Sequence, residues 1–98
     1  MIPRSIRRED RPTILWIKTD GLTLELNDGL YPDDEGWLDF AQSKVGGYVI
    51  RYPRPPTFVT SMWVNEEGLL MGLPLNEGVF EMYGISVVGD VLVYMRNV

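Results

Sequence analysis

The apolar residues of this chain come in short runs that end at glycine, proline, aspartate or asparagine, and such punctuation is typical of a small sheet. Residues 13–18 read TILWIK and residues 22–26 read LTLEL, with Asp20 and Gly21 between them, which predicts a β-hairpin. Further strand-like runs lie at 48–52, 58–64, 69–71 and 90–95. The turn formed by residues 65–68 predicts a second hairpin, between 58–64 and 69–71.

One segment, DDEGWLDFAQSKVGG at 33–47, has the pattern of a full helix. Its opening carboxylates can cap the helix, and Gly46 with Gly47 can end it. The helical spacing puts five apolar residues on one face, namely Trp37, Leu38, Phe40, Ala41 and Val45. Asn76 can cap a second, short helix that runs to Tyr83.

We therefore predict an α+β fold: a small mixed or antiparallel sheet of about five strands, with one main helix on one face and a second short helix. The order of the elements also fits a β-grasp-like arrangement. With 98 residues the chain has room for one core. Residues 1–12 form a basic N-terminal arm, expected to be flexible, and residues 13–98 form a single domain.

The charge separates these two parts of the chain. The arm holds four arginines, whereas residues 13–98 hold five basic and twelve acidic side chains. An acidic body repels phosphate backbones, so a nucleic-acid partner is not expected. The chain has no cysteine and no long apolar segment, which favours a cytoplasmic protein with no membrane contact.

The residue types exclude most catalytic chemistry. Histidine and cysteine are absent, and there is no GxGxxG or GxxxxGK motif for a nucleotide phosphate. We therefore expect no enzyme activity, no catalytic residue and no cofactor. The alternative is a carboxylate- or metal-dependent enzyme, with Mg²⁺ or Ca²⁺ on residues 33–35 or on Glu66 and Glu67. The favoured interpretation is a helix N-terminus for the first group and solvated turn residues for the second, so no metal site is predicted.

Aromatic side chains offer a second kind of site. Tyr48 and Tyr52 alternate along one strand-like run, and Trp63 lies on another, so the three could form a stacking platform for a ligand. A core position is the competing interpretation for Trp63 and is favoured for Trp16 and Trp37.

Three motifs carry a resemblance to a known family: VGGY at 45–48, NEEGLLMGLPLN at 65–76 and VGDVLV at 88–93. Together they resemble an uncharacterised domain-of-unknown-function family of small proteins from phages, plasmids and bacteria. The resemblance implies an accessory protein of a mobile element. It implies no activity, substrate or catalytic residue.

The polar residues of these motifs define the candidate binding site, since loops are the usual carriers of function. Asn65, Glu66, Glu67, Asn76 and Asp90 are predicted to converge at one end of the sheet, and the opposing interpretation is that they preserve the fold.

The functional hypothesis is a non-catalytic binding protein that acts on a host protein or sequesters a small-molecule ligand. An acidic DNA mimic is a further alternative, based on the carboxylates between residues 28 and 39. A homodimer is also expected, because the strands carry more apolar surface than one helix can cover, at Tyr48, Tyr52, Met62, Trp63, Leu70 and Met71.

Overall fold

The structure, a computed structural model, describes residues 11–96, so the predicted arm lies outside the described residues except for Arg11 and Pro12. Five strands and two helices follow one another in the order β1 (Thr13–Ile17), β2 (Thr23–Glu25), α1 (Trp37–Val45), β3 (Val49–Arg51), β4 (Val59–Asn65), α2 (Glu77–Tyr83) and β5 (Val91–Met95). The predicted α+β class is confirmed.

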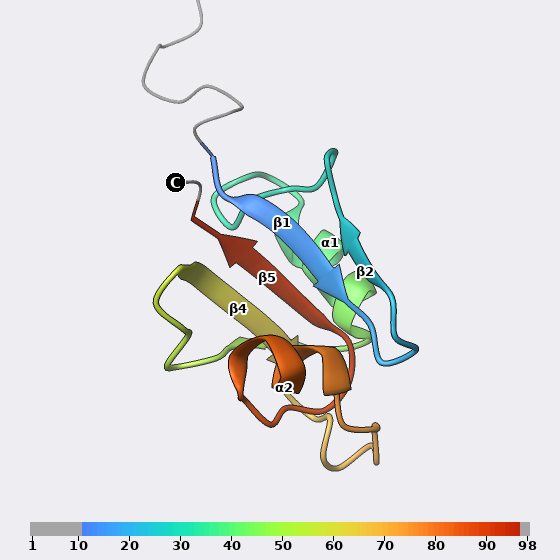
Figure 1. The fold of residues 1–98 in the computed structure, drawn as a ribbon. Helices are drawn as coiled ribbons and strands as arrows, with labels where there is room; N and C mark the ends of the chain where they lie inside the picture. The colour runs from blue at the N-terminus through green and yellow to red at the C-terminus, as the bar shows by residue number, and fades with distance from the viewer. Residues whose placement is uncertain (1–10, 97–98) are drawn as a thin grey trace, which may run out of the picture.

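All five strands belong to one sheet, in the order β2-β1-β5-β4-β3 (Figure 1). Every neighbouring pair is antiparallel, so the sheet is antiparallel and not mixed. The first and last strands lie side by side at the centre, as a β-grasp-like order requires, but here they run antiparallel, whereas the central strands of a β-grasp are parallel.

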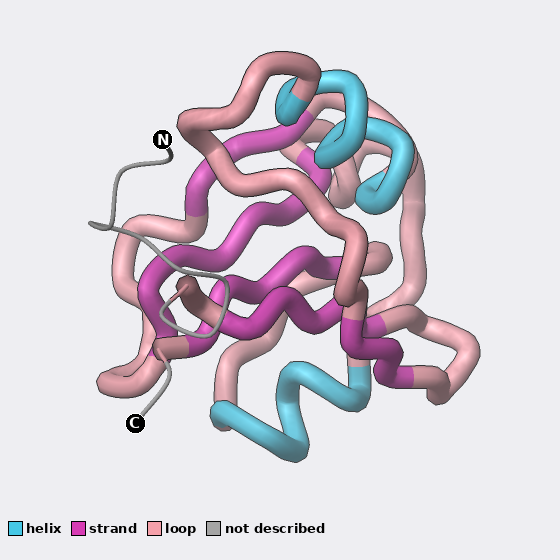
Figure 2. The backbone as a smooth tube through the Cα atoms, turned by 90° about the horizontal axis from the view of Figure 1, so that it is seen from above, coloured by secondary structure: helices cyan, strands magenta, loops and turns pink. Residues whose placement is uncertain are grey.

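The helices cover opposite faces of the sheet (Figure 2). The central strand β5 is therefore buried on both sides, and Val91, Leu92, Val93 and Tyr94 are each at most 1% exposed. On the α1 face, Leu92 and Tyr94 pack with Trp37 of the helix. Neither helix within residues 11–96 has the length and apolar character needed to cross a bilayer.

The second face is covered by α2. Val91 and Val93 of β5 pack there with Val79 of the helix, and Met62 of β4 belongs to the same cluster and is fully buried. The expectation that a second copy must cover this apolar strand surface therefore loses part of its basis.

The start of α1 differs from the prediction. Its N-cap is Gly36, in the left-handed conformation at φ 84°, and it makes no side-chain cap. Asp34 does not cap the helix because its carboxylate accepts from the Tyr31 amide at 2.8 Å and pairs with Arg11 at 3.5 Å. Leu38, predicted on the buried face, is 53% exposed.

A short chain of hydrogen bonds fixes α1 against β5. Trp37 Nε1 donates to the Tyr94 hydroxyl at 2.9 Å, and that hydroxyl donates to the Leu30 carbonyl at 2.6 Å. Burial of the hydroxyl raises the pKa of Tyr94 to about 12. The Trp37 ring also meets Trp63 edge-on, with centroids 4.6 Å apart.

The predicted strand at 69–71 is wrong. This segment forms successive turns instead of a hairpin partner for β4. Its amides bond locally, from Met71 to the Glu67 carbonyl and from Leu73 to the Gly68 carbonyl. Gly72 adopts φ 70°, a left-handed conformation that ends any extended run.

Candidate functional site

Three of the predicted site residues, Asn65, Asn76 and Asp90, do lie at one end of the sheet, and each is used by the fold. Asn76 is fully buried. Its amide nitrogen donates to the carbonyls of Ile17 and Gly89, at 2.8 and 2.9 Å, and its oxygen accepts from the Val79 amide at 3.0 Å. Its side chain thus caps α2, as predicted, and joins that helix to the end of β1.

Asn65 and Asp90 make similar structural links. The Asn65 amide donates to the Val45 carbonyl at the end of α1, and its oxygen accepts from the Glu67 amide at 2.8 Å. The Asp90 carboxylate accepts from the Thr19 amide at 2.9 Å and so holds the turn after β1.

The predicted aromatic residues are not brought together as one platform. Trp63 packs with the α1-face cluster, and its indole donates to Ser61. Tyr52 packs with the α2-face cluster on the other side of the sheet. Tyr48 is 64% exposed at the edge.

The predicted residues Glu66 and Glu67 are exposed and begin a projecting segment, which we call the 66–75 loop. At its tip Leu69 is 83% exposed, Leu70 is 88% exposed and Met71 is 53% exposed. Leu69 and Leu70 are the two most exposed large apolar side chains of the described residues, and Met71 follows them directly in the sequence. The tip is therefore an apolar surface presented to solvent.

The base of the 66–75 loop is fixed to the rest of the fold. Its last residues bond to the connection before β5, through Gly89 N to the Pro74 carbonyl at 2.8 Å and a bridge between Leu75 and Val88. Gly68 is buried against Val88. The apolar tip is thus presented by a fixed base.

Gly89→Ala tests this attachment. Gly89 has φ 81°, and a Cβ there would lie 2.8 Å from Leu73 Cδ1. The alanine variant is expected to lose about 1–3 kcal/mol of unfolding free energy, measured by urea denaturation. Gly21→Ala is the control, since Gly21 has φ 97° but an open Cβ position. An equal loss of unfolding free energy in both variants would mean that the loss comes from the positive φ alone, and that close packing of Gly89 against Leu73 adds nothing to it.

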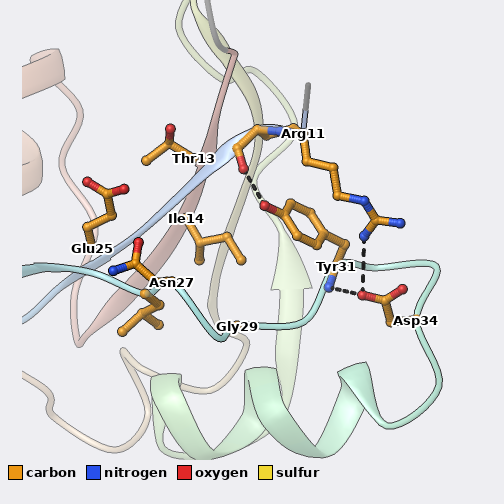
Figure 3. A pocket seen from close by; sticks show the side chains of 10 residues that line it. Arg11, Thr13, Ile14, Glu25, Asn27, Gly29, Tyr31 and Asp34 are labelled. Carbon is orange, nitrogen blue, oxygen red and sulfur yellow. Dashed lines mark hydrogen bonds and ion pairs between the residues drawn. The ribbon is translucent and has the colours of Figure 1, made fainter. Parts of the chain in front are cut away.

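An open groove of about 730 Å³ lies on the α1 side, between β1 and the chain after β2 (Figure 3). It is lined by Arg11, Pro12, Thr13, Ile14, Glu25, Leu26, Asn27, Gly29, Tyr31 and Asp34.

Several polar groups of the groove bind one another. The Tyr31 hydroxyl donates to the Pro12 carbonyl, and the Arg11 guanidinium lies 4.7 Å from the centre of the Tyr31 ring. Two carboxylates also line the groove: that of Asp34 is paired with Arg11 at 3.5 Å, and the other belongs to Glu25. Among residues 11–96, no group of three or more histidines, cysteines, aspartates or glutamates is arranged to hold a metal ion.

The groove was not predicted from the sequence. The acidic stretch at 28–39 pointed to the neighbourhood of the groove, but not to a cavity. Leu70 and Met71 were predicted to lie on apolar surface that one helix cannot cover, and both are exposed, but in a loop and not in a strand. Leu69, which precedes them, was not part of that prediction and is 83% exposed.

A family model described as a domain of unknown function, DUF3846, matches residues 25–97. The chain belongs to the DUF3846 family. The DUF3846 match includes both helices, β3, β4, β5 and the whole 66–75 loop, whereas β1 precedes it. Neither the curated proteins nor the solved structures contain a significant match to the chain.

Proposed function

We propose that this DUF3846 chain is a non-catalytic binding protein that attaches to another protein through the tip of the 66–75 loop. The observation that carries the proposal is the exposure of Leu69 and Leu70, at 83% and 88%. An apolar side chain on a fixed projection gains free energy when a partner buries it, and little ordering entropy opposes that gain.

The tip has the properties of a contact centre in a protein interface. Such centres are small groups of side chains that fill a pocket on the partner and dominate the binding energy. The polar residues around the tip are suited to the rim of the contact, since Glu66 and Glu67 are exposed at the base of the loop.

The absence of histidine and cysteine supports a binding role over a catalytic one. In the mobile-element setting that the sequence resemblance implies, the bound protein would be a factor of the host cell. Acidic mimicry of DNA has weaker support, because Asp34 of the acidic stretch is already paired with Arg11.

The test is the double variant Leu69→Ser, Leu70→Ser. It is expected to fold with an unfolding free energy within about 0.5 kcal/mol of the wild type, because both side chains are already in solvent. It should lose a protein that the tagged wild type captures from a bacterial lysate. Binding of that protein, once identified and purified, is then measured for both forms by calorimetry.

A matched control is Leu22→Ser, Leu38→Ser, since these leucines are 52% and 53% exposed and lie elsewhere on the surface. This control should bind like the wild type. If the tip variant and the control bind the purified protein equally well, the tip is not the contact surface and the proposal is wrong.

The groove supports ligand sequestration as a second candidate function. Asp34 is paired with Arg11, but the carboxylate of Glu25 also lines the groove and favours a small cation over a nucleotide, whose phosphates it would repel. Spermidine is a suitable probe. A rise in melting temperature with spermidine that Glu25→Gln abolishes would support this function, and no rise in the wild type would remove it.

A further inference from the structure

The surface around the tip combines apolar side chains with charges of a single sign. From residue 55 to residue 95 the chain contains no lysine or arginine, but it contains five carboxylates. Four of these carboxylates are exposed on the 66–75 loop and α2, at Glu66, Glu67, Glu77 and Glu81. The loop runs directly into α2, and both lie at the same end of the molecule (Figure 1).

The helix carries further exposed apolar side chains. Besides Leu69, Leu70 and Met71, the exposed large apolar side chains of the loop and helix are Leu75, Phe80 and Met82, at 45%, 50% and 49% exposure. We call the loop and α2 together the acidic apolar surface. Its two methionines have flexible side chains that adapt to different apolar partners.

Two lysines, Lys18 and Lys44, lie near this end of the sheet, but on the α1 face, opposite to α2. The ammonium groups of Lys18 and Lys44 lie 4.7 and 4.6 Å from the centre of the Trp16 ring. That indole donates to the Lys44 carbonyl of α1, which places this cluster on the α1 face. Lys18 is also paired with Asp20 at 3.4 Å. Neither lysine is therefore paired with the four glutamates of the acidic apolar surface.

We infer that the partner of the acidic apolar surface is a protein segment with apolar side chains flanked by lysine and arginine. This inference rests on the proposed function and specifies its partner. Leucine and methionine side chains of the tip would enter the apolar part of the segment, and the four glutamates would face its basic side chains. Complementary charge at the rim of an apolar contact raises the association rate and rejects wrong partners.

The same charges disfavour two other occupants. A second copy of the chain would bring two sets of glutamates together across a self-complementary contact. An anionic membrane attracts lysine and arginine and repels carboxylates. A basic segment of another protein satisfies both the apolar and the charged groups.

The experiment titrates the full chain with two synthetic amphipathic helical peptides, one of leucine and lysine and the other with glutamate in place of every lysine. The wild type is expected to bind the lysine peptide and not the glutamate peptide. Binding should weaken as salt rises, because exposed charges are screened. Vesicles of phosphatidylcholine, with and without phosphatidylserine, are tested in parallel and should not bind.

Variants then separate the apolar and charged contributions to affinity for the lysine peptide. Leu69→Ser, Leu70→Ser should raise the Kd about tenfold or more. Glu66→Gln, Glu67→Gln should raise it about three- to tenfold and reduce its salt dependence. The charge-matched control is Asp28→Asn, Asp33→Asn. Both residues are exposed, and they lie in the segment that the Tyr31 hydroxyl bonds to Pro12 at the start of β1, away from the tip. This control should change the Kd about twofold or less.

The outcomes distinguish the inference from the proposed function. Equal weakening by the glutamine and asparagine pairs would show attraction to the net charge alone, and the inference would be wrong. Preferential binding of vesicles, or self-association lost in the Leu69→Ser, Leu70→Ser variant, would also overturn it. If that variant loses the captured cellular partner while Glu66→Gln, Glu67→Gln binds that partner normally, the proposed function stands and only the basic partner is excluded.

Discussion

Replacing Asn76 by alanine is expected to lower the free energy of unfolding by about 4 kcal/mol. The substitution removes three hydrogen bonds at a position with no exposed surface. The carbonyls of Ile17 and Gly89 and the amide of Val79 would stay buried without their partner, and each such group costs about 1–3 kcal/mol. The measurement is urea denaturation followed by tryptophan fluorescence.

Two further variants assign the loss to its cause. Asn76→Asp keeps an oxygen that can accept from the Val79 amide but cannot donate to the two carbonyls, so it should be as unstable as Asn76→Ala. Glu77→Ala changes the adjacent exposed residue and should cost about 0.5 kcal/mol or less. A nearly stable Asn76→Asp variant would mean that Asn76 is only a helix cap.

Asn76 also illustrates what local sequence can predict. Its place before a short helical pattern identified it as a cap, because capping depends on a bond three residues away. Its bond to Ile17 joins positions 59 residues apart, and no local pattern encodes such a contact. The residue was therefore placed in the fold correctly, while its link to β1 was found only in the structure.

The same distinction explains the predictions for the sheet and the main helix. Alternation and turn residues are local, so the five observed strands were found close to their bounds, although a sixth was wrongly predicted at 69–71. The cap of α1 was wrong because the Asp34 carboxylate accepts from the Tyr31 amide, three residues away, and also pairs with Arg11, 23 residues away. For Trp63, the sheet face that it occupies depends on strand pairing, which the sequence did not specify.

The sequence predicted where the candidate site lies, but not which of its side chains are exposed to a partner. The polar residues of the motifs do gather at one end of the sheet, but the side chains of Asn65, Asn76 and Asp90 are used by the fold, and only Glu66 and Glu67 are exposed. Leu69 and Leu70 were taken as part of a strand because they follow a turn, and Leu70 was expected on apolar surface that one helix cannot cover. Their exposure follows from the local bonds of the 66–75 loop, which turn the chain away from β4. The acidic apolar surface therefore depends on tertiary structure.

The second large effect is a loss of stability at alkaline pH that originates at Tyr94. Its pKa is about 12 in the folded chain because burial disfavours the phenolate, and about 10 in the unfolded chain. Below pH 10 both states hold the proton and the stabilisation is complete. As pH rises toward 12 the unfolded state loses its proton first, so the unfolding free energy should fall by about 2 kcal/mol between pH 9 and 12.

Tyr94→Phe isolates this effect from the other groups that titrate at alkaline pH. At pH 7 the variant should be less stable by about 1–3 kcal/mol, because the Trp37 indole and the Leu30 carbonyl lose their common partner. Between pH 9 and 12 the wild type should lose stability faster than the variant, so the two curves converge. Tyr83, whose pKa burial also raises, is present in both proteins and leaves the comparison unchanged. Parallel curves of unfolding free energy against pH would contradict this prediction. They would show that Tyr94 has the same pKa in the folded and the unfolded chain, so that its burial against α1 and Leu30 does not raise that pKa.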